Sequence, residues 1–362
     1  MDMITAQMLV ARLDGPDGPF VLDVREPDEF EAWRIPGAVN IPLGSLAGRL
    51  AEVPKGREVV AVCAVGARAA TAVDRLASAG YDAEALEGGM GAWATVFDDA
   101  EIDVDSAQVV QIRRRGKGCL SYMVAAGGAA VVIDPSADIA QYTDRAAARG
   151  WTLSHVVDTH LHADHVSGAR MLAEASGAVL VLNPADPFHF GFTPLHDGMH
   201  IAIGDDVALR VSVLSTPGHT MGSTALVLGE SAIFTGDTLF LESVGRPDLA
   251  DRAEEFAHEL YTSLHDKVLT LPDGALVLPA HFSELVEVHA GAVVGEPLGS
   301  LRARLWQLDA DEDTFVAWAT RSVTDRPPNY VAIVAANQGG VPMDTSARLE
   351  LEAGPNRCAV TG

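Results

Sequence analysis

The densest group of chemically active side chains in this sequence is the segment from Thr159 to His165, which reads THLHADH. Its imidazoles and carboxylate belong to His160, His162, Asp164 and His165. Imidazole and carboxylate together suit divalent first-row metals such as zinc, iron and manganese. Because the segment follows an apolar run, we expect a loop that leaves a strand end and turns all four groups towards one point. The segment predicts a metal site, against the plainer interpretation of a polar loop whose histidines only cap or solvate.

Three later positions repeat this arrangement of a metal-type side chain directly after an apolar run. They are His219 after residues 211–214, Asp237 after residues 232–234, and His281 after residues 276–278. Each run has the composition of a buried strand. Strand ends that deliver ligands to one edge are what a sheet-supported site requires. We therefore expect these side chains to meet the first segment in one place.

A second kind of chemistry is indicated by Cys63 in the segment CAVGAR, between a predicted strand at 59–62 and a predicted helix at 67–79. Backbone N–H groups in such a loop, together with a helix N-terminus, stabilise a thiolate or a bound persulfide. Arg68 adds a fixed positive charge, and Gly66 permits the turn. The segment alone is weak support, because a buried cysteine at a strand end is common.

The composition places the chain among globular proteins and limits its partners. The 362 residues are 48% hydrophobic and 21% charged, which suits two or three domains with their own cores. A net charge of −25 disfavours nucleic-acid binding, which needs a basic surface. No apolar run approaches the roughly 18 to 20 residues that cross a bilayer, and the N-terminus lacks the pattern of a signal peptide. We therefore expect a cytoplasmic protein that binds neither nucleic acid nor a membrane.

The chain divides by pattern into four segments. Residues 1–99 alternate short apolar strands with helical stretches, which implies a small parallel α/β domain. The acidic residues 100–106 have the composition of a linker, and residues 107–340 are rich in predicted strands. Residues 341–362 show weak periodicity, so we expect a partly disordered tail. Within the second domain we predict helices at 138–149, 166–176 and 253–266.

The remaining two cysteines stand far from Cys63 and from each other, so the chain has no disulfide framework. Cys119 lies inside a predicted strand, and we expect a buried structural thiol there. Cys358 lies in the tail, where we expect a free thiol without function.

Residues 3–97 resemble the rhodanese domain segment by segment. The matching segments are DVREPDEF at 23–30, IPGA at 35–38, NIP at 40–42, LEGG at 86–89, and Trp93. In that family the cysteine at Cys63 carries sulfane sulfur as a persulfide, and the resemblance assigns catalysis to Cys63 and Arg68. One departure is Arg34, where many rhodaneses have histidine, and we expect this difference to have no effect on function. The competing interpretation is a rhodanese-like module without catalysis.

Residues 107–340 resemble the metallo-β-lactamase superfamily, because H-x-H-x-D-H is followed by His219, Asp237 and His281 in the family's order. The resemblance implies an αββα sandwich with a metal site. In hydrolases of the glyoxalase II type, two Zn, Fe or Mn ions are held. One ion would use His160, His162 and His219, the other would use Asp164, His165 and His281, and Asp237 would bridge them.

The persulfide dioxygenase branch keeps the same motif but differs in its metal. There a single Fe(II) sits on the equivalents of His160, His219 and Asp237, a ligand set that leaves positions open for O₂ and substrate. The other motif residues, His162, Asp164, His165 and His281, would orient those ligands.

One feature favours the dioxygenase branch, and another qualifies it. The segment GRPD at 245–248 resembles that branch, whose equivalent of Arg246 helps to hold the thiol; the plainer alternative is a surface ion pair with Asp248. We assign Arg246 and Gly66 to substrate binding. Glutathione-using members tend to have Asp-Tyr after His281, so Phe282-Ser283 departs from their pattern and leaves the thiol carrier open.

Together the resemblances imply a persulfide dioxygenase fused to a thiosulfate or persulfide sulfurtransferase, with one Fe(II) per chain. Its partners would be a small-molecule thiol persulfide, thiosulfate or sulfite, O₂, and further copies of the chain in a homo-oligomer. Two alternatives stay open: a thioester hydrolase with two metal ions and an accessory rhodanese domain, and a sulfur carrier without catalysis.

Overall fold

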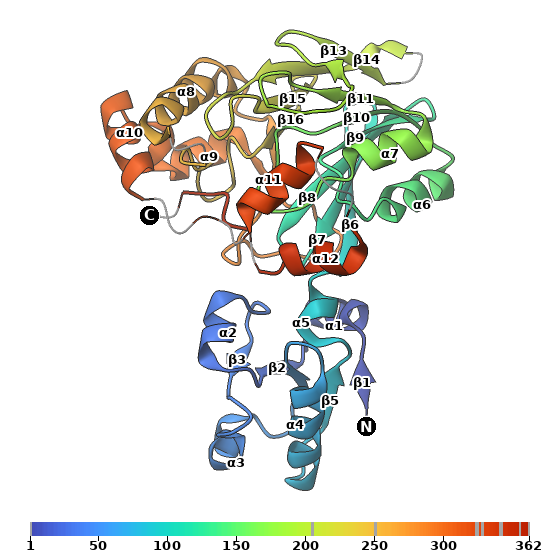
Figure 1. The fold of residues 1–362 in the computed structure, drawn as a ribbon, viewed down its shortest axis with the longest axis vertical. Coiled ribbons are helices and arrows are strands. Elements are labelled where there is room, and N and C mark those ends of the chain that lie inside the picture. The colour runs from blue at the N-terminus through green and yellow to red at the C-terminus, as the bar shows by residue number, and fades with distance from the viewer. Residues whose placement is uncertain are drawn as a thin grey trace.

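A computed structural model describes residues 2–203, 206–249, 252–322, 326, 329–339, 343–354 and 356–360. Figure 1 shows two domains, a small one at the N-terminal side and a larger β-rich one, joined where helix α5 (Gly89–Trp93) meets strands β6 (Phe97–Val104) and β7 (Ala107–Arg114). Among the described residues, no helix combines the length and apolar character needed to span a membrane.

The small domain is a five-stranded parallel sheet with helices packed against it. The strand order is β1 (Met3–Ile4), β5 (Ala83–Leu86), β4 (Val59–Val62), β2 (Phe20–Asp23) and β3 (Val39–Asn40). All four residues of central strand β4 are buried, because a parallel strand covered on both faces is apolar throughout. The helices are α1 (Ala6–Leu13), α2 (Pro27–Ala32), α3 (Leu46–Arg49), α4 (Ala67–Ser78) and α5. The predicted α/β domain is confirmed.

The large domain is a sandwich of two sheets with helices outside. The first sheet has the order β12 (Thr193–Pro194), β11 (Val179–Leu182), β10 (Thr152–Val157), β9 (Ala129–Ile133), β8 (Cys119–Ala126), β7 and β6. The second has the order β13 (His200–Ile203), β14 (Asp206–Ser215), β15 (Thr224–Leu228), β16 (Ala232–Gly236), β17 (Leu276–Pro279) and β18 (Glu296–Pro297). Their inner faces share one apolar core, in which the Tyr122 and Phe234 rings lie 4.9 Å apart.

Helices cover both outer faces of the sandwich. Helices α6 (Ala140–Arg149) and α7 (Ala169–Ser176) lie on the side of the first sheet, and α8 (Ala253–Asp266), α9 (Leu298–Arg304) and α10 (Glu312–Arg321) on the other side (Figure 1). Helices α6, α7 and α8 confirm the three helices that the sequence predicts in this domain. The αββα sandwich is confirmed.

Residues 100–104, which we expected in a linker, belong to the edge strand β6, and residues 105–106 form the turn that leads into β7. Strand β6 pairs antiparallel with β7 along its whole length, from Phe97 opposite Arg114 to Val104 opposite Ala107. Its acidic side chains face outwards or pair with arginines, and Asp98 pairs with both Arg113 and Arg115. Charge on an exposed edge strand discourages pairing with other chains. The acidic composition therefore hides a strand.

The tail forms a helix and buried contacts in its described residues, 343–354 and 356–360. Helix α11 (Tyr330–Asn337) precedes it, and helix α12 (Thr345–Leu351) is capped by the Asp344 carboxylate, which accepts from the Ala347 N–H. Glu352 then forms a buried ion pair with Arg114 at 2.7 Å. The sequence does not reveal this packing because the partner lies more than two hundred positions away.

Candidate functional sites

The loops at the ends of four strands bring together all seven metal-type side chains of the large domain. The first four follow β10, His219 lies in the turn after β14, Asp237 follows β16 and His281 follows β17. All seven residues are buried and at most 2% exposed. Such burial of imidazoles and carboxylates is costly unless they are paired or bind a metal.

Five of these side chains present a buried atom that lacks any hydrogen-bond partner in the described part of the chain, and two of the five are Nδ1 of His162 and Nε2 of His281. The other three atoms lie close together: Nε2 of His160, Nε2 of His219 and Oδ2 of Asp237. The two nitrogens lie 3.5 and 3.4 Å from that oxygen. The other ring nitrogens are occupied: His160 Nδ1 lies 3.0 Å from Thr159 Oγ1, and His219 Nδ1 lies 2.9 Å from the carbonyl oxygen of Arg246. Ring nitrogens held on one side and unsatisfied on the other are typical of metal ligands. The residues present fit a two-histidine, one-carboxylate metal site.

His162 stands in a different group. Its Nε2 lies 3.2 Å from an Asp134 carboxylate oxygen and 3.8 Å from one of Asp158. These three residues form a potential ligand cluster that is separate from the one containing His160, His219 and Asp237. Burial raises the pKa of Asp158 to about 6, although the nearby His162 opposes this shift.

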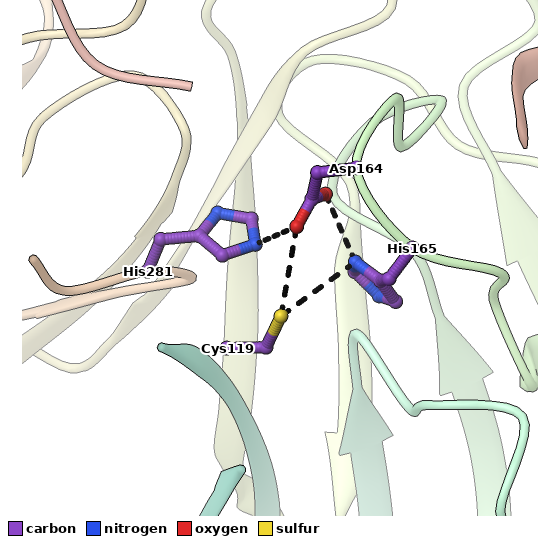
Figure 2. Close-up of side chains that lie close together, drawn as sticks. All are labelled: Cys119, Asp164, His165 and His281. Carbon is purple, nitrogen blue, oxygen red and sulfur yellow. Dashed lines mark hydrogen bonds and ion pairs between the residues drawn. The ribbon is translucent and has the colours of Figure 1, made fainter. Parts of the chain in front are cut away.

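A third cluster, drawn in Figure 2, combines Asp164, His165 and His281 with Cys119. Asp164 lies 3.0 Å from both His165 Nδ1 and His281 Nε2. Burial alone would raise the pKa of Asp164, but the charges of these two imidazoles outweigh it and hold that pKa well below its ordinary value. His281 Nδ1 also lies 2.6 Å from Asp237 Oδ1, which connects this cluster to the three-ligand site.

Both remaining cysteines lie closer to these clusters than the sequence indicates. Cys119 is buried as we expected, but its Sγ is 3.6 Å from an Asp164 oxygen. Cys358 is completely buried and offers a possible ligand atom within 4.8 Å of those of Asp237 and His281. Nothing in the local sequence of the tail reveals this contact, because it depends on the path of the chain after α12.

Sequence reasoning also missed the residues that hold the ligand loops in place. Asp134 accepts from the backbone N–H and hydroxyl of Thr159, Asp186 accepts from the Leu161 N–H, and Asn337 donates to the carbonyls of His162 and His165. Asp134 directly follows the buried strand β9, so the pattern of a carboxylate after an apolar run could have found it. Asn337 offers no such signal.

Arg246 is buried within the large domain, not exposed at a surface. Its guanidinium donates to both carboxylate oxygens of Asp248 at 2.7 and 2.9 Å and to the carbonyl oxygen of Arg357 at 3.0 Å. Its own carbonyl accepts from His219. The ion pair with Asp248 exists, but it lies in the interior and ties the tail to the turn that carries His219.

The Cys63 loop in the small domain has the geometry of an anion-binding turn. The Cys63 Sγ accepts from the backbone N–H groups of Gly66 at 3.1 Å and Ala69 at 3.4 Å. Gly66 has a φ of +105°, which a residue with a side chain rarely adopts. Two donors directed at one sulfur stabilise a thiolate or a persulfide anion.

Arg68 forms a specific ion pair beside this loop. Its guanidinium donates to both oxygens of Glu29 at 2.6 and 2.7 Å. The hydrogen bond from Arg68 is the main cause that lowers the pKa of Glu29 to about 2, against the opposing effect of burial. Arg68 is therefore held by helix α2 beside the loop.

Helix α5 closes the loop from the other side and depends on glycine. Met90 N–H donates to the Cys63 carbonyl oxygen at 2.9 Å. Gly89 has a φ of +57°, and a Cβ atom there would lie 2.1 Å from the same oxygen. The LEGG segment thus permits a close approach of α5 to the cysteine loop.

Comparisons with known proteins find a family match for each of the two domains. The model of the Metallo-beta-lactamase superfamily matches residues 114–281, and the model of the Rhodanese-like domain matches residues 5–95. The mitochondrial persulfide dioxygenase ETHE1 of Bos taurus is 35% identical over 158 residues, which are 42% of this chain and 58% of that protein. The chain thus matches little more than half the length of that relative.

Two further similarities cover more of the compared proteins. The hydroxyacylglutathione hydrolase of Rhodospirillum rubrum is 34% identical over 189 residues, which are 51% of this chain and 70% of that protein. The structure of ETHE1 from Myxococcus xanthus has a TM-score of 0.55 and 27% identity, and the match covers 67% of this chain and 98% of that one. With these matches and the sandwich that carries the histidine loops, the chain belongs to the metallo-beta-lactamase superfamily and carries a rhodanese domain on its N-terminal side.

Proposed function

We propose that the large domain oxidises a low-molecular-weight thiol persulfide with O₂, and that Cys63 transfers sulfane sulfur. The observation that carries the first part is the division of the histidines. The possible ligand atoms of His160, His219 and Asp237 lie within 4.8 Å of one another, whereas His162 forms a separate cluster with Asp134 and Asp158. This division supports one iron on a two-histidine, one-carboxylate set more than a pair of metals that needs His162.

The overall reaction balances as RSSH + O₂ + H₂O → RSH + SO₃²⁻ + 2H⁺, in which the sulfane sulfur loses four electrons to O₂. His160, His219 and Asp237 would hold Fe(II), which supplies the O₂ chemistry that side chains lack. Thr159 and the Arg246 carbonyl fix the two imidazole rings. The Asp237–His281 contact fixes the carboxylate, so the ligand geometry exists before substrate binds.

At the second centre, the Cys63 thiolate attacks the outer sulfur of thiosulfate. The S–S bond of thiosulfate breaks, sulfite leaves, and Cys63 keeps the sulfur as a persulfide. The Gly66 and Ala69 N–H groups bind the anionic sulfur. A low-molecular-weight thiolate then attacks the outer sulfur of the persulfide, which regenerates the Cys63 thiolate and yields RSSH. The persulfide RSSH that the Cys63 site forms is then the substrate of the metal site.

The test is oxygen uptake and sulfite formation with a thiol persulfide, measured on protein purified without oxygen. We expect His219→Ala to lose oxygen uptake by at least about 10³-fold, because it removes a ligand, while transfer from thiosulfate to a thiol stays at the wild-type rate. Oxygen uptake that survives in His219→Ala would exclude this role for the site.

The second candidate is a thioester hydrolase with two metal ions. It is favoured by the cluster of Asp164, His165 and His281, which lies next to the three-ligand site. The similarity to hydroxyacylglutathione hydrolases also supports it. Release of thiol from a hydroxyacylglutathione by the wild-type protein, without oxygen uptake on a persulfide, would establish this candidate instead.

A further inference from the structure

The loop that carries Cys63 offers an incoming sulfur donor an aliphatic surface and a single charged side chain. Residues 64–67 read AVGA and carry no polar side chain, and the charge at the end of the loop belongs to Arg68. Val65 is 76% exposed, whereas Cys63 itself is only 1% exposed. A donor must therefore bring its outer sulfur into the loop, past the Val65 side chain and close to Arg68.

The positive charge of Arg68 is offset by a carboxylate. Its guanidinium donates to both oxygens of Glu29 at 2.6 and 2.7 Å, and this contact raises the pKa of Arg68. Because Arg68 lowers the pKa of Glu29 to about 2, Glu29 is ionised at neutral pH. Arg25 also acts on Glu29, but it is 4% exposed and pairs with Asp23 at 2.6 Å. The cation nearest to the reactive sulfur along the loop is thus already compensated.

Two classes of sulfane-sulfur donor bring different charges to this loop. Transfer from thiosulfate is Cys63–S⁻ + S₂O₃²⁻ → Cys63–S–S⁻ + SO₃²⁻, which gathers three negative charges at the site. Transfer from an organic persulfide in its protonated form is Cys63–S⁻ + RSSH → Cys63–S–SH + RS⁻, which involves one. In both reactions the thiolate bonds to the outer sulfur, and the electron pair of the broken S–S bond leaves with sulfite or with the thiolate. Because like charges repel in a partly buried site, only thiosulfate depends on an uncompensated cation.

We propose that the Cys63 site takes sulfur from an organic persulfide in preference to thiosulfate, and that Glu29 sets this preference by offsetting the charge of Arg68. Glu29 acts through Arg68 and not by contact with the donor, so it is a specificity-determining residue. Thiosulfate remains a donor, at a lower rate. This inference rests on the proposed role of Cys63 in sulfur transfer and adds the class of donor to it.

The test is single-turnover sulfur transfer to the full-length protein without oxygen, so that the metal site does not consume the persulfide. The donors are thiosulfate and the persulfide of 2-mercaptoethanol, which has no charge outside its persulfide group, and the release of sulfite or thiol is followed. We expect the wild type to react faster with the persulfide. Glu29→Gln should raise the ratio of the thiosulfate rate to the persulfide rate about fivefold, because it uncovers the charge of Arg68. Glu31→Gln removes the same charge from an exposed position of α2 and should leave the ratio unchanged.

A second variant adds a cation instead of removing an anion. Val65→Lys places an uncompensated ammonium on the loop at an exposed position, so we expect folding to be unaffected and the same ratio to rise about five- to tenfold. Ala77→Lys adds the same charge near the far end of α4, where the side chain is also exposed, and should leave the ratio unchanged. This variant decides the question if Glu29→Gln fails to fold.

Two results would overturn the proposal. One is a wild-type protein that reacts faster with thiosulfate than with the persulfide. The other is a ratio that Glu29→Gln and Val65→Lys leave unchanged or lower, which includes an equal loss of both rates from a purely structural effect. Failure of the proposed function looks different: Cys63→Ser would then release sulfite and thiol at the wild-type rates. Transfer that requires Cys63 but shows an unchanged ratio would reject the donor preference alone.

Discussion

At the scale of single residues, unsatisfied polar atoms define the site better than the number of histidines does. Buried polar groups in proteins nearly always have partners, so the unpartnered atoms of His160, His219 and Asp237 need an explanation. A shared metal ion explains all three. His162 also has an unpartnered atom, Nδ1, but its Nε2 lies beside the carboxylates of Asp134 and Asp158, and we propose that it orients the loop.

Cys63 should be required for sulfur transfer and dispensable for oxidation. We expect Cys63→Ser to reduce transfer from thiosulfate to a thiol by at least about 10³-fold, because a serine hydroxyl forms no stable persulfide. Oxygen uptake with a supplied persulfide should stay at the wild-type rate. Cys358→Ser serves as the comparison, and a Cys63→Ser protein with undiminished sulfur transfer would reject the sulfurtransferase assignment.

The Glu29–Arg68 pair should contribute to stability only while Glu29 is ionised. The folded-state pKa of Glu29 is lowered to about 2, so the contribution is complete above the ordinary pKa near 4.5 and is lost as the pH falls towards 2. Both side chains are about one-third exposed, so we expect less than about 1 kcal/mol. Urea midpoints of wild type and Glu29→Gln should therefore differ at pH 7 and converge below pH 4. A difference that grows on acidification would contradict the pair, and Glu87→Gln is the exposed control.

At the scale of elements, the site depends on segments that are distant in sequence. The sequence predicts the strands and the loops that follow them, because apolar runs and the residues after them are local patterns. It does not predict β6, whose acidic residues hide the alternation, or the tail, whose contacts depend on Arg114. Nor does it predict that Arg34, which we expected to have no functional effect in place of histidine, forms an ion pair with Glu284 of the other domain.

Gly89 gives a sharp test of how α5 and the cysteine loop fit together. Gly89→Ala would place a Cβ 2.1 Å from the Cys63 carbonyl oxygen, so the loop must shift. We expect sulfur transfer to fall on the order of 10²-fold, as for a displacement of about 1 Å in an active site. Gly91→Ala, whose nearest contact is 3.9 Å, is the matched control. Equal activity of the two variants would show that the close approach has no functional role.

Glu352 should hold the C-terminal tail against the loop that carries His160 to His165. Its carboxylate pairs with Arg114 and accepts from the Val166 N–H at 2.8 Å, next to His165. Glu352→Gln leaves Arg114 buried without its counter-charge, at a cost of about 3 to 5 kcal/mol. We expect faster hydrogen exchange across residues 343–354. Glu350→Gln on the exposed face of α12 should leave exchange unchanged, and equal exchange in both variants would refute the anchor.

At the scale of the whole molecule, the two domains are joined by contacts at several points. Trp33 Nε1 donates to the Gly116 carbonyl at 2.9 Å, and Arg114 Nε donates to the Ala94 carbonyl at 2.7 Å. The same β7–β8 turn reaches the tail through Lys117 and leads into Cys119. The β7–β8 turn thus connects the end of α5, whose first turn closes the Cys63 loop, with the strand that carries Cys119.

The most direct test of the central assignment is the metal content of the wild-type protein and of His162→Ala, both purified anaerobically. One iron on His160, His219 and Asp237 predicts about one iron per chain in each protein. Two metal ions per chain in the wild type, with one of them lost in His162→Ala, would contradict the assignment and establish the two-metal site.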